Sequence, residues 1–160
     1  MSEITGIRTI TKHNLIIGIN FTYGWMPTIF EFCSDNFDES LNILNRAKKG
    51  EIPKIEQLGI LRNLFNNSLV GTSKLLHFIN PEIFAIWDSR VYRYLTGKSA
   101  HGYRINDYEA YLSYLEFCDY LIKQPDFERV HRVICNLIGY PMTKFRTAEL
   151  VMYSTGGTKR

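Results

Sequence analysis

Two charged residues stand out in residues 71 to 95, GTSKLLHFINPEIFAIWDSRVYRYL, because each adjoins an apolar run. Lys74 begins the run KLLHFI, and Asp88 follows the second run, IFAIW. Desolvation lowers the pKa of a lysine and favours the neutral amine that a nucleophile needs. A carboxylate at the start of the following helix is suited to stabilise positive charge or to move a proton. The pair therefore predicts Schiff-base chemistry on an electrophilic sugar or carbonyl carbon.

Each residue also has a structural interpretation. Asp88 directly precedes SRVYRYL, where its carboxylate can accept backbone N–H bonds and complement the helix dipole. Lys74 can lay its aliphatic stem over apolar surface and keep its amine in water. Taken singly, these residues favour the structural roles, and only their combination points to catalysis.

The same stretch resembles the signature of the helix-hairpin-helix DNA glycosylases, the family that contains 8-oxoguanine glycosylase and endonuclease III. In that family a glycine-containing hairpin leads into a helix with a catalytic lysine, and LVGTSKLLHF matches this part with Lys74. A catalytic aspartate then starts the next helix, and FAIWDSRVYRYL matches this part with Asp88, followed by Arg90 and Val91. The C-terminal YPMTKFRTAELVMYSTGG resembles, more loosely, the final helix of smaller members.

The resemblance implies an all-α fold and base excision from damaged or modified double-stranded DNA. Some members carry a four-cysteine iron–sulfur cluster, which the three cysteines here exclude, so no metal or cofactor is expected. The target nucleotide would be flipped into a pocket, where the amine of Lys74 attacks the anomeric carbon while Asp88 supports the transition state. The hairpin and nearby basic residues would contact phosphates; these residues are Gly71, Thr72, Ser73, Arg90, Arg93, Lys144 and Arg146. Further basic residues lie beyond the aspartate, at Lys98, His101 and Arg104, and the candidates to stack on a base are Trp87, Tyr92, Tyr103 and Phe145.

A second interpretation retains the predicted fold but assigns no catalytic activity to the protein. The predicted hairpin has the single glycine Gly71 where the family usually has two, and Lys74 is closer to Asp88 than the family spacing. These departures favour a non-catalytic helical module, of phage or bacterial origin, that binds nucleic acid or a protein. RNA or free nucleotides are also compatible substrates, and the sequence leaves the target base and the oligomeric state open.

The composition indicates a folded helical chain. Its 160 residues suit a single domain, or two small helical lobes with the cleft near residues 70–95, and 45% hydrophobic residues provide a core. A formal charge of +3 permits nucleic-acid binding without requiring it. Cap and stop signals predict a predominantly α domain of about six to eight helices. Residues 7–32, rich in β-branched and aromatic residues, fit either a hairpin or a pair of buried helices.

Individual helix boundaries follow from capping residues. Ser34 or Asp35 is predicted to begin a helix that ends near Gly50, and Pro53 to open the next. NNSLVGTS is expected to break the helical pattern before Lys74. Later helices are predicted from a capping box of Asn106 and Glu109, from Asp126 to Gly139, and from Thr143 to Tyr153.

The cysteines and the hydropathy of the sequence indicate the cellular compartment in which the protein is expected. The three cysteines, Cys33, Cys118 and Cys135, lie in apolar contexts and are expected to be buried free thiols. The four histidines have no metal-like spacing, so a zinc site is not expected. No apolar run reaches membrane-spanning length, and the first residues lack a signal-peptide pattern. We therefore expect a cytoplasmic protein that does not bind membranes.

Overall fold

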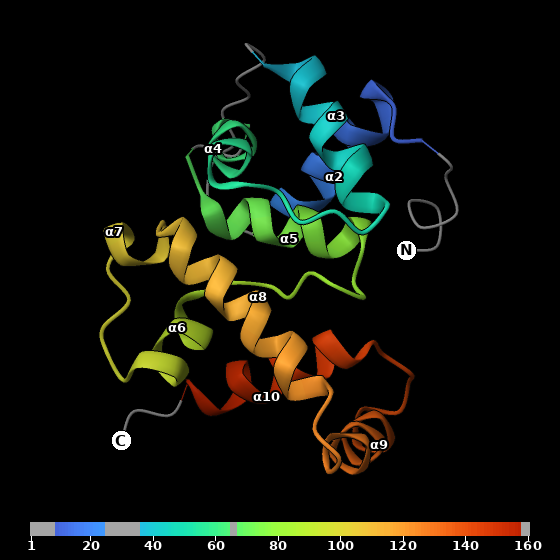
Figure 1. Ribbon diagram of the computed structural model, residues 1–160, viewed down its shortest axis with the longest axis vertical. Helices are drawn as coiled ribbons and strands as arrows, with labels where there is room; N and C mark the ends of the chain where they lie inside the picture. Colours follow the sequence, from blue (N-terminus) through green and yellow to red (C-terminus); the bar gives the residue numbers. More distant parts are fainter. Residues whose placement is uncertain (1–8, 25–35, 65–66, 158–160) are drawn as a thin grey trace. The chain divides into compact units, whose positions relative to one another are not determined.

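The computed structural model describes residues 9–24, 36–64 and 67–157 (Figure 1). These residues form nine α-helices and no strand. The predicted all-α class is therefore confirmed, while the predicted count of six to eight helices was too low. The chain divides into two compact units, Met1–Asn80 and Pro81–Arg160.

In the first unit, helix α5 (Leu69–Ile79) contacts all three of the other described helices. These are α2 (Lys12–Tyr23), α3 (Phe37–Lys48) and α4 (Ile55–Asn63). The sequence of α5 is apolar over most of its length, which explains why it is enclosed on several sides. The core of this unit is aliphatic, with Leu15, Ile19, Leu44, Leu58, Leu61 and Leu76 among its buried residues.

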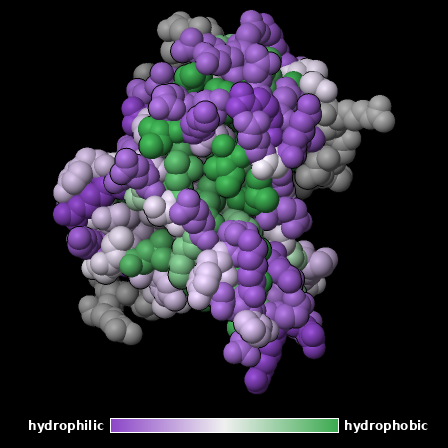
Figure 2. All heavy atoms as spheres, in the orientation of Figure 1, coloured by the Kyte–Doolittle hydropathy of each residue, from purple (hydrophilic) through white to green (hydrophobic). Residues whose placement is uncertain are grey.

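In the second unit, helix α10 (Lys144–Thr155) has the corresponding central position and contacts three helices. These are α6 (Ser89–Thr96), α8 (Tyr108–Ile122) and α9 (Phe127–Ile138), while the short helix α7 (Gly102–Ile105) follows α6. The core here is aromatic and centres on Trp87, whose indole N–H donates to the Ile105 carbonyl over 2.8 Å. Tyr92 and Tyr114 pack against the indole with ring centroids 5.9 and 5.2 Å away. Hydrophilic side chains predominate over α9 on the face shown in Figure 2.

The break predicted at NNSLVGTS was placed too late. Ser68 is the N-cap of α5, and its hydroxyl accepts the Gly71 N–H over 3.2 Å. The preceding Asn67 has a positive φ of 56°, so the chain turns there and not at Gly71. Gly71, Thr72 and Ser73 are buried residues of α5, and Lys74 therefore lies inside the helix instead of opening it.

Other boundary predictions have mixed outcomes. Gly50 and Gly139 each follow the end of a helix, as predicted, and have positive φ values of 100° and 85°. Thr143 also caps α10 as predicted, because its hydroxyl accepts the Arg146 N–H. The capping box of Asn106 and Glu109 was wrong, because Asp107 is the N-cap of α8 and accepts the Ala110 N–H. Residues 12–23 of the ambiguous N-terminal stretch are helical. Ser34, Asp35 and Cys33 lie outside the described residues.

No described helix is both long and apolar enough to cross a membrane.

Candidate nucleic-acid interface

Asp88 is the N-cap of α6, as its structural interpretation predicts. Its Oδ1 atom accepts the N–H groups of Arg90 over 2.8 Å and Val91 over 3.1 Å. The half-buried carboxylate thereby satisfies two of the unpaired donors at the helix start. Its second oxygen, Oδ2, receives no hydrogen bond from the described residues. Asp88 is thus held in one orientation by one oxygen, and the other remains available to a ligand.

Two arginines on α6 are fixed against the end of α10. The guanidinium of Arg90 lies 4.6 Å from the ring centroid of Tyr153, a cation–π contact. Arg93 donates from Nε to the Gly156 carbonyl over 3.1 Å. Both side chains are exposed despite these contacts, so their charges reach solvent from defined positions.

The glycines after α10 make this packing possible. A Cβ atom on Gly156 would lie 2.0 Å from the Arg90 carbonyl oxygen, and one on Gly157 would lie 3.1 Å from Arg90 Nη1. At position 156 only glycine allows the chain to approach the backbone of α6 so closely, whereas at position 157 the Arg90 side chain could move aside. The sequence motif STGG, residues 154–157, therefore positions the two arginines.

The segment after Asp88 carries positive charge and exposed aromatic rings. Residues 89–106, which we call the α6–α7 basic segment, contain four Lys or Arg residues and no Asp or Glu. Tyr103 is 72% exposed, and the His101 ring lies parallel to it with centroids 6.0 Å apart. The guanidinium of Arg104 is 5.3 Å from the Tyr103 centroid, and its Nη1 donates to the Ser99 carbonyl. Exposed rings among cations are typical of surfaces that bind single-stranded nucleic acid.

The other three candidate stacking aromatics are core residues. Trp87, Tyr92 and Phe145 are all buried. Of the four, Tyr103 has the exposure that stacking on a base requires.

Lys74 belongs to the first unit and Asp88 to the second. Lys74 is half-buried, and its neighbours Ser73 and Leu75 are buried. Gly71, Thr72 and Ser73, which were predicted to form a phosphate-binding hairpin, lie instead within helix α5. The Gly71 and Thr72 N–H groups donate to Ser68, and the Ser73 hydroxyl donates to the Val70 carbonyl. These three residues are therefore engaged within α5.

Lys144 and Arg146 form ion pairs at the start of α10. Lys144 Nζ lies 2.7 Å from a carboxylate oxygen of Glu128 on α9, and the hydrogen bond lowers the pKa of Glu128. Arg146 pairs with the buried carboxylate of Glu149. Both basic residues thus have clear structural partners, and neither lies in the α6–α7 basic segment.

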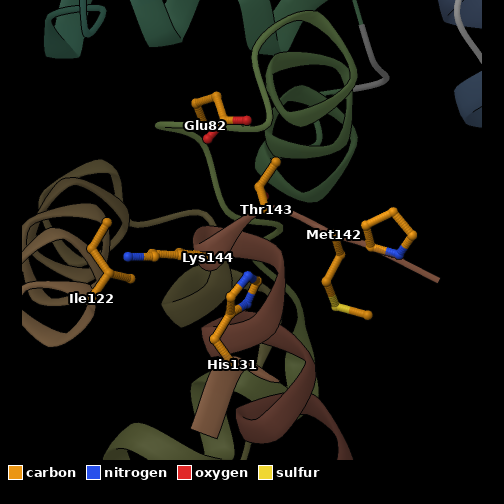
Figure 3. Close-up of a pocket in the computed structure, with 7 residues that line it drawn as sticks. Glu82, Ile122, His131, Met142, Thr143 and Lys144 are labelled. Atoms are coloured by element: carbon orange, nitrogen blue, oxygen red, sulfur yellow. The ribbon is translucent and has the colours of Figure 1, made fainter. Parts of the chain in front are cut away.

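Lys144 also borders an open cavity of about 410 Å³ in the second unit (Figure 3). His131, in its wall, has Nδ1 2.7 Å from the Thr147 hydroxyl, and the Thr143 hydroxyl donates to the Pro81 carbonyl. Figure 3 shows the Lys144 side chain extending toward Ile122, with Glu82 near the top of the view. Carboxylate, amine and imidazole groups occur together here, but their charges favour no single class of ligand. The described residues contain no group of three His, Cys, Asp or Glu side chains that could hold a metal ion.

Comparison of the chain with protein families, with curated proteins and with solved structures finds no match.

Proposed function

We propose that this protein binds DNA through the α6–α7 basic segment and excises a damaged or modified base in the manner of a DNA glycosylase. The observation that carries the proposal is the adjacency of two features. A carboxylate with one uncommitted oxygen, Asp88, directly precedes a segment with four cations, no anion and an exposed tyrosine.

Charge and geometry support the binding step. Arg90 and Arg93 hold fixed positions on α6, so ordering them on a phosphate costs less side-chain entropy than ordering free arginines. Tyr103 offers an aromatic surface on which an unstacked base can lie. A nucleotide flipped from a duplex exposes both its base and its phosphates to such a surface.

The capping geometry supports the role of Asp88 in the chemical step. Base excision develops positive charge on the sugar as the bond to the base breaks, and a fixed carboxylate stabilises that charge. The two N–H bonds to Oδ1 hold the carboxylate in place before the substrate arrives. Little reorganisation is then needed in the transition state.

Lys74 is the proposed nucleophile. Its amine forms a bond to the anomeric carbon, the base departs with the bonding electrons and takes up a proton, and opening of the sugar leaves an imine. That imine permits cleavage of the strand. Lys74 lies half-buried on α5 between the buried Ser73 and Leu75, and its amine is the group that imine formation requires.

Borohydride trapping tests the chemistry. Wild-type protein and duplexes that each carry a different base lesion are incubated together with borohydride, which reduces an imine to a stable covalent adduct. We expect an adduct with at least one lesion, none with Lys74→Ala, and release of free base slowed about 100-fold or more by Asp88→Asn. Absence of both adduct and released base with every lesion, from folded wild-type protein, contradicts the proposed excision.

A non-catalytic nucleic-acid-binding module is the second candidate. The burial of Gly71, Thr72 and Ser73 within α5 favours it, because the DNA-anchoring hairpin of the glycosylase signature is missing there. This function predicts binding that depends on Tyr103 and Arg93 without adduct or released base. Binding and trapping measured on the same preparations therefore separate the two candidates.

A further inference from the structure

The excess positive charge of the chain is concentrated in the α6–α7 basic segment. The whole sequence has 19 Lys and Arg residues against 16 Asp and Glu residues. Four of the basic residues and none of the acidic ones lie in residues 89–106, which leaves 15 basic residues against 16 acidic ones in the rest of the chain. A nucleic-acid backbone is therefore expected to meet more favourable charge along this segment than along the rest of the sequence.

Three aromatic rings of the segment are open to solvent. Tyr94, on α6, is 44% exposed, and Tyr103, on α7, is 72% exposed. The exposed ring of His101 lies within 4° of parallel to the ring of Tyr103. Aromatic rings that are exposed among cations offer surfaces on which bases can stack.

Hydrogen bonds hold the open loop that joins α6 to α7 (Figure 1). Arg104 Nη1 and the His101 backbone N–H both donate to the Ser99 carbonyl, each over 3.1 Å. The Ile105 carbonyl accepts the indole N–H of the buried Trp87, which ties the end of α7 to the core. The loop therefore has a defined shape before a ligand arrives, and less conformational entropy is lost when the ligand binds.

Stacking on these rings requires unpaired bases. In a duplex the two faces of each base are covered by its neighbours, and the grooves present base edges only. The cations of the segment can contact the phosphates of a duplex or of a single strand, but a tyrosine ring gains a stacking partner only where a base is unstacked. Residues 71–73, the predicted anchor for a duplex phosphate, lie within α5 instead.

We propose that the nucleic acid bound by the α6–α7 basic segment is an unpaired DNA strand, with bases stacked on Tyr94 and Tyr103 and phosphates contacted by the arginines. The preferred substrate of the proposed excision is then a lesion in a single-stranded or locally melted stretch, and not one in a fully paired duplex. This inference rests on the DNA binding proposed above. Stacking depends little on base identity, so we expect little sequence preference.

Fluorescence anisotropy of the full chain with labelled oligonucleotides tests the strand preference. The probes are a single DNA strand of mixed sequence, the same strand in an undamaged duplex, and a stable abasic strand of equal length and charge. We expect the single strand to bind at least about 10-fold more tightly than either of the other two probes, because only its bases can stack. Equal or tighter binding of the duplex, or of an RNA strand of the same sequence, overturns the proposal.

Tyrosine variants test the stacking surfaces. Tyr94→Ala and Tyr103→Ala should each weaken binding of the base-bearing strand about 5- to 100-fold and leave binding of the abasic strand and the duplex unchanged. Tyr120→Ala is the matched control, because it removes a ring that is 62% exposed on α8, outside the segment, and it should change none of the three affinities. Equal losses for the base-bearing and abasic strands overturn the proposal. Circular dichroism on each variant verifies that the helices are retained.

Base release separates failure of this inference from failure of the proposed excision. Release of a damaged base from a duplex at least as fast as from the same lesion in a single strand overturns the strand preference and leaves the excision intact. Tyrosine-dependent preference for the single strand, without release of a base from any substrate, supports the inference and contradicts the excision. Lack of binding to every oligonucleotide overturns both.

Discussion

Gly156 lies so close to Arg90 that a single methyl group would collide with the backbone of α6. A Cβ atom would stand 2.0 Å from the Arg90 carbonyl oxygen and 2.8 Å from its carbonyl carbon. Neither atom belongs to a flexible side chain that could turn aside. The contact between α6 and α10, and with it the placement of Arg90 and Arg93, thus depends on a residue without a side chain.

Gly156→Ala is therefore expected to lower the free energy of unfolding by about 1–3 kcal/mol through overpacking. It should also weaken DNA binding, because Arg93 loses its fixed carbonyl partner. Urea unfolding monitored by tryptophan fluorescence measures the first effect. Gly102→Ala is the matched control, since a Cβ there has no atom within 4 Å; an equal loss in both variants would contradict this explanation.

Two substitutions of Asp88 should separate folding from chemistry. Asp88→Ala removes the cap of α6 and should cost about 1 kcal/mol of stability, whereas Asp88→Asn retains an oxygen that can accept the same two N–H groups. Both should abolish most base release, because neither retains the charge. Thermal unfolding and a base-release assay measure the two effects. Full activity in Asp88→Asn would show that the carboxylate serves only as a cap.

DNA binding should depend on Tyr103 and on salt. Tyr103→Ala is expected to weaken binding of an unpaired or flipped nucleotide by about 1–3 kcal/mol with no loss of stability, since the ring is largely exposed. Arg93→Gln should reduce the slope of log affinity against log salt by about 1 if the arginine contacts a phosphate. Fluorescence anisotropy with labelled oligonucleotides measures both. Lys123→Gln at the C-cap of α8, which removes an exposed cation outside the segment, should change neither quantity.

The thiol of Cys118 should resist modification. Burial raises its pKa to about 12, so it stays protonated, whereas the half-buried Cys135 is more accessible. Titration of the native chain with a thiol reagent at mild pH should therefore leave Cys118 unmodified until urea is added. Rapid modification of Cys118 in the folded protein, detected by peptide mass spectrometry, would contradict its burial.

The same pKa has a consequence for stability in alkali. In the unfolded chain the thiol ionises near its ordinary pKa of 9, but in the folded protein it does so only near 12. The unfolded state therefore loses a proton first, and stability should fall as the pH rises from 9 to 12. Burial also raises the pKa of Tyr111 and Tyr114, which adds to the loss above pH 10. Cys118→Ala should reduce this slope in urea unfolding measured as a function of pH.

Local signals in the sequence predicted many features of the fold. Asp88 and Thr143 cap helices, and Gly139 ends one, because these residues act on backbone groups within a few positions. Competition between neighbouring signals explains the errors. Asn106 and Asp107 are both good caps, and only packing decides between them. Gly71 resembled a turn, but Ser68 caps α5 three residues earlier, and tertiary packing retains the glycine inside the helix.

The candidate site was predictable only in part. The sequence identified Arg90 and Arg93 as candidate phosphate ligands. Their side chains, however, are held in place by Tyr153 and Gly156, which lie more than sixty residues away in the sequence. Tyr103 is exposed and can stack on a base, whereas Trp87 is buried and cannot. The sequence does not distinguish them, because burial depends on the packing of the whole aromatic core and not on residue type. The joint action of Lys74 and Asp88 remains a prediction for the trapping experiment.

The close packing of the STGG motif against α6 also determines which end of the chain should carry an affinity tag. An affinity tag fused after Arg160 would begin just beyond the glycines that contact Arg90. If the arginines bind oligonucleotides as proposed, acidic residues held near Gly157 would lower the measured affinity. Purification handles for assays of this chain therefore belong at the amino terminus, or should be cleaved before measurement.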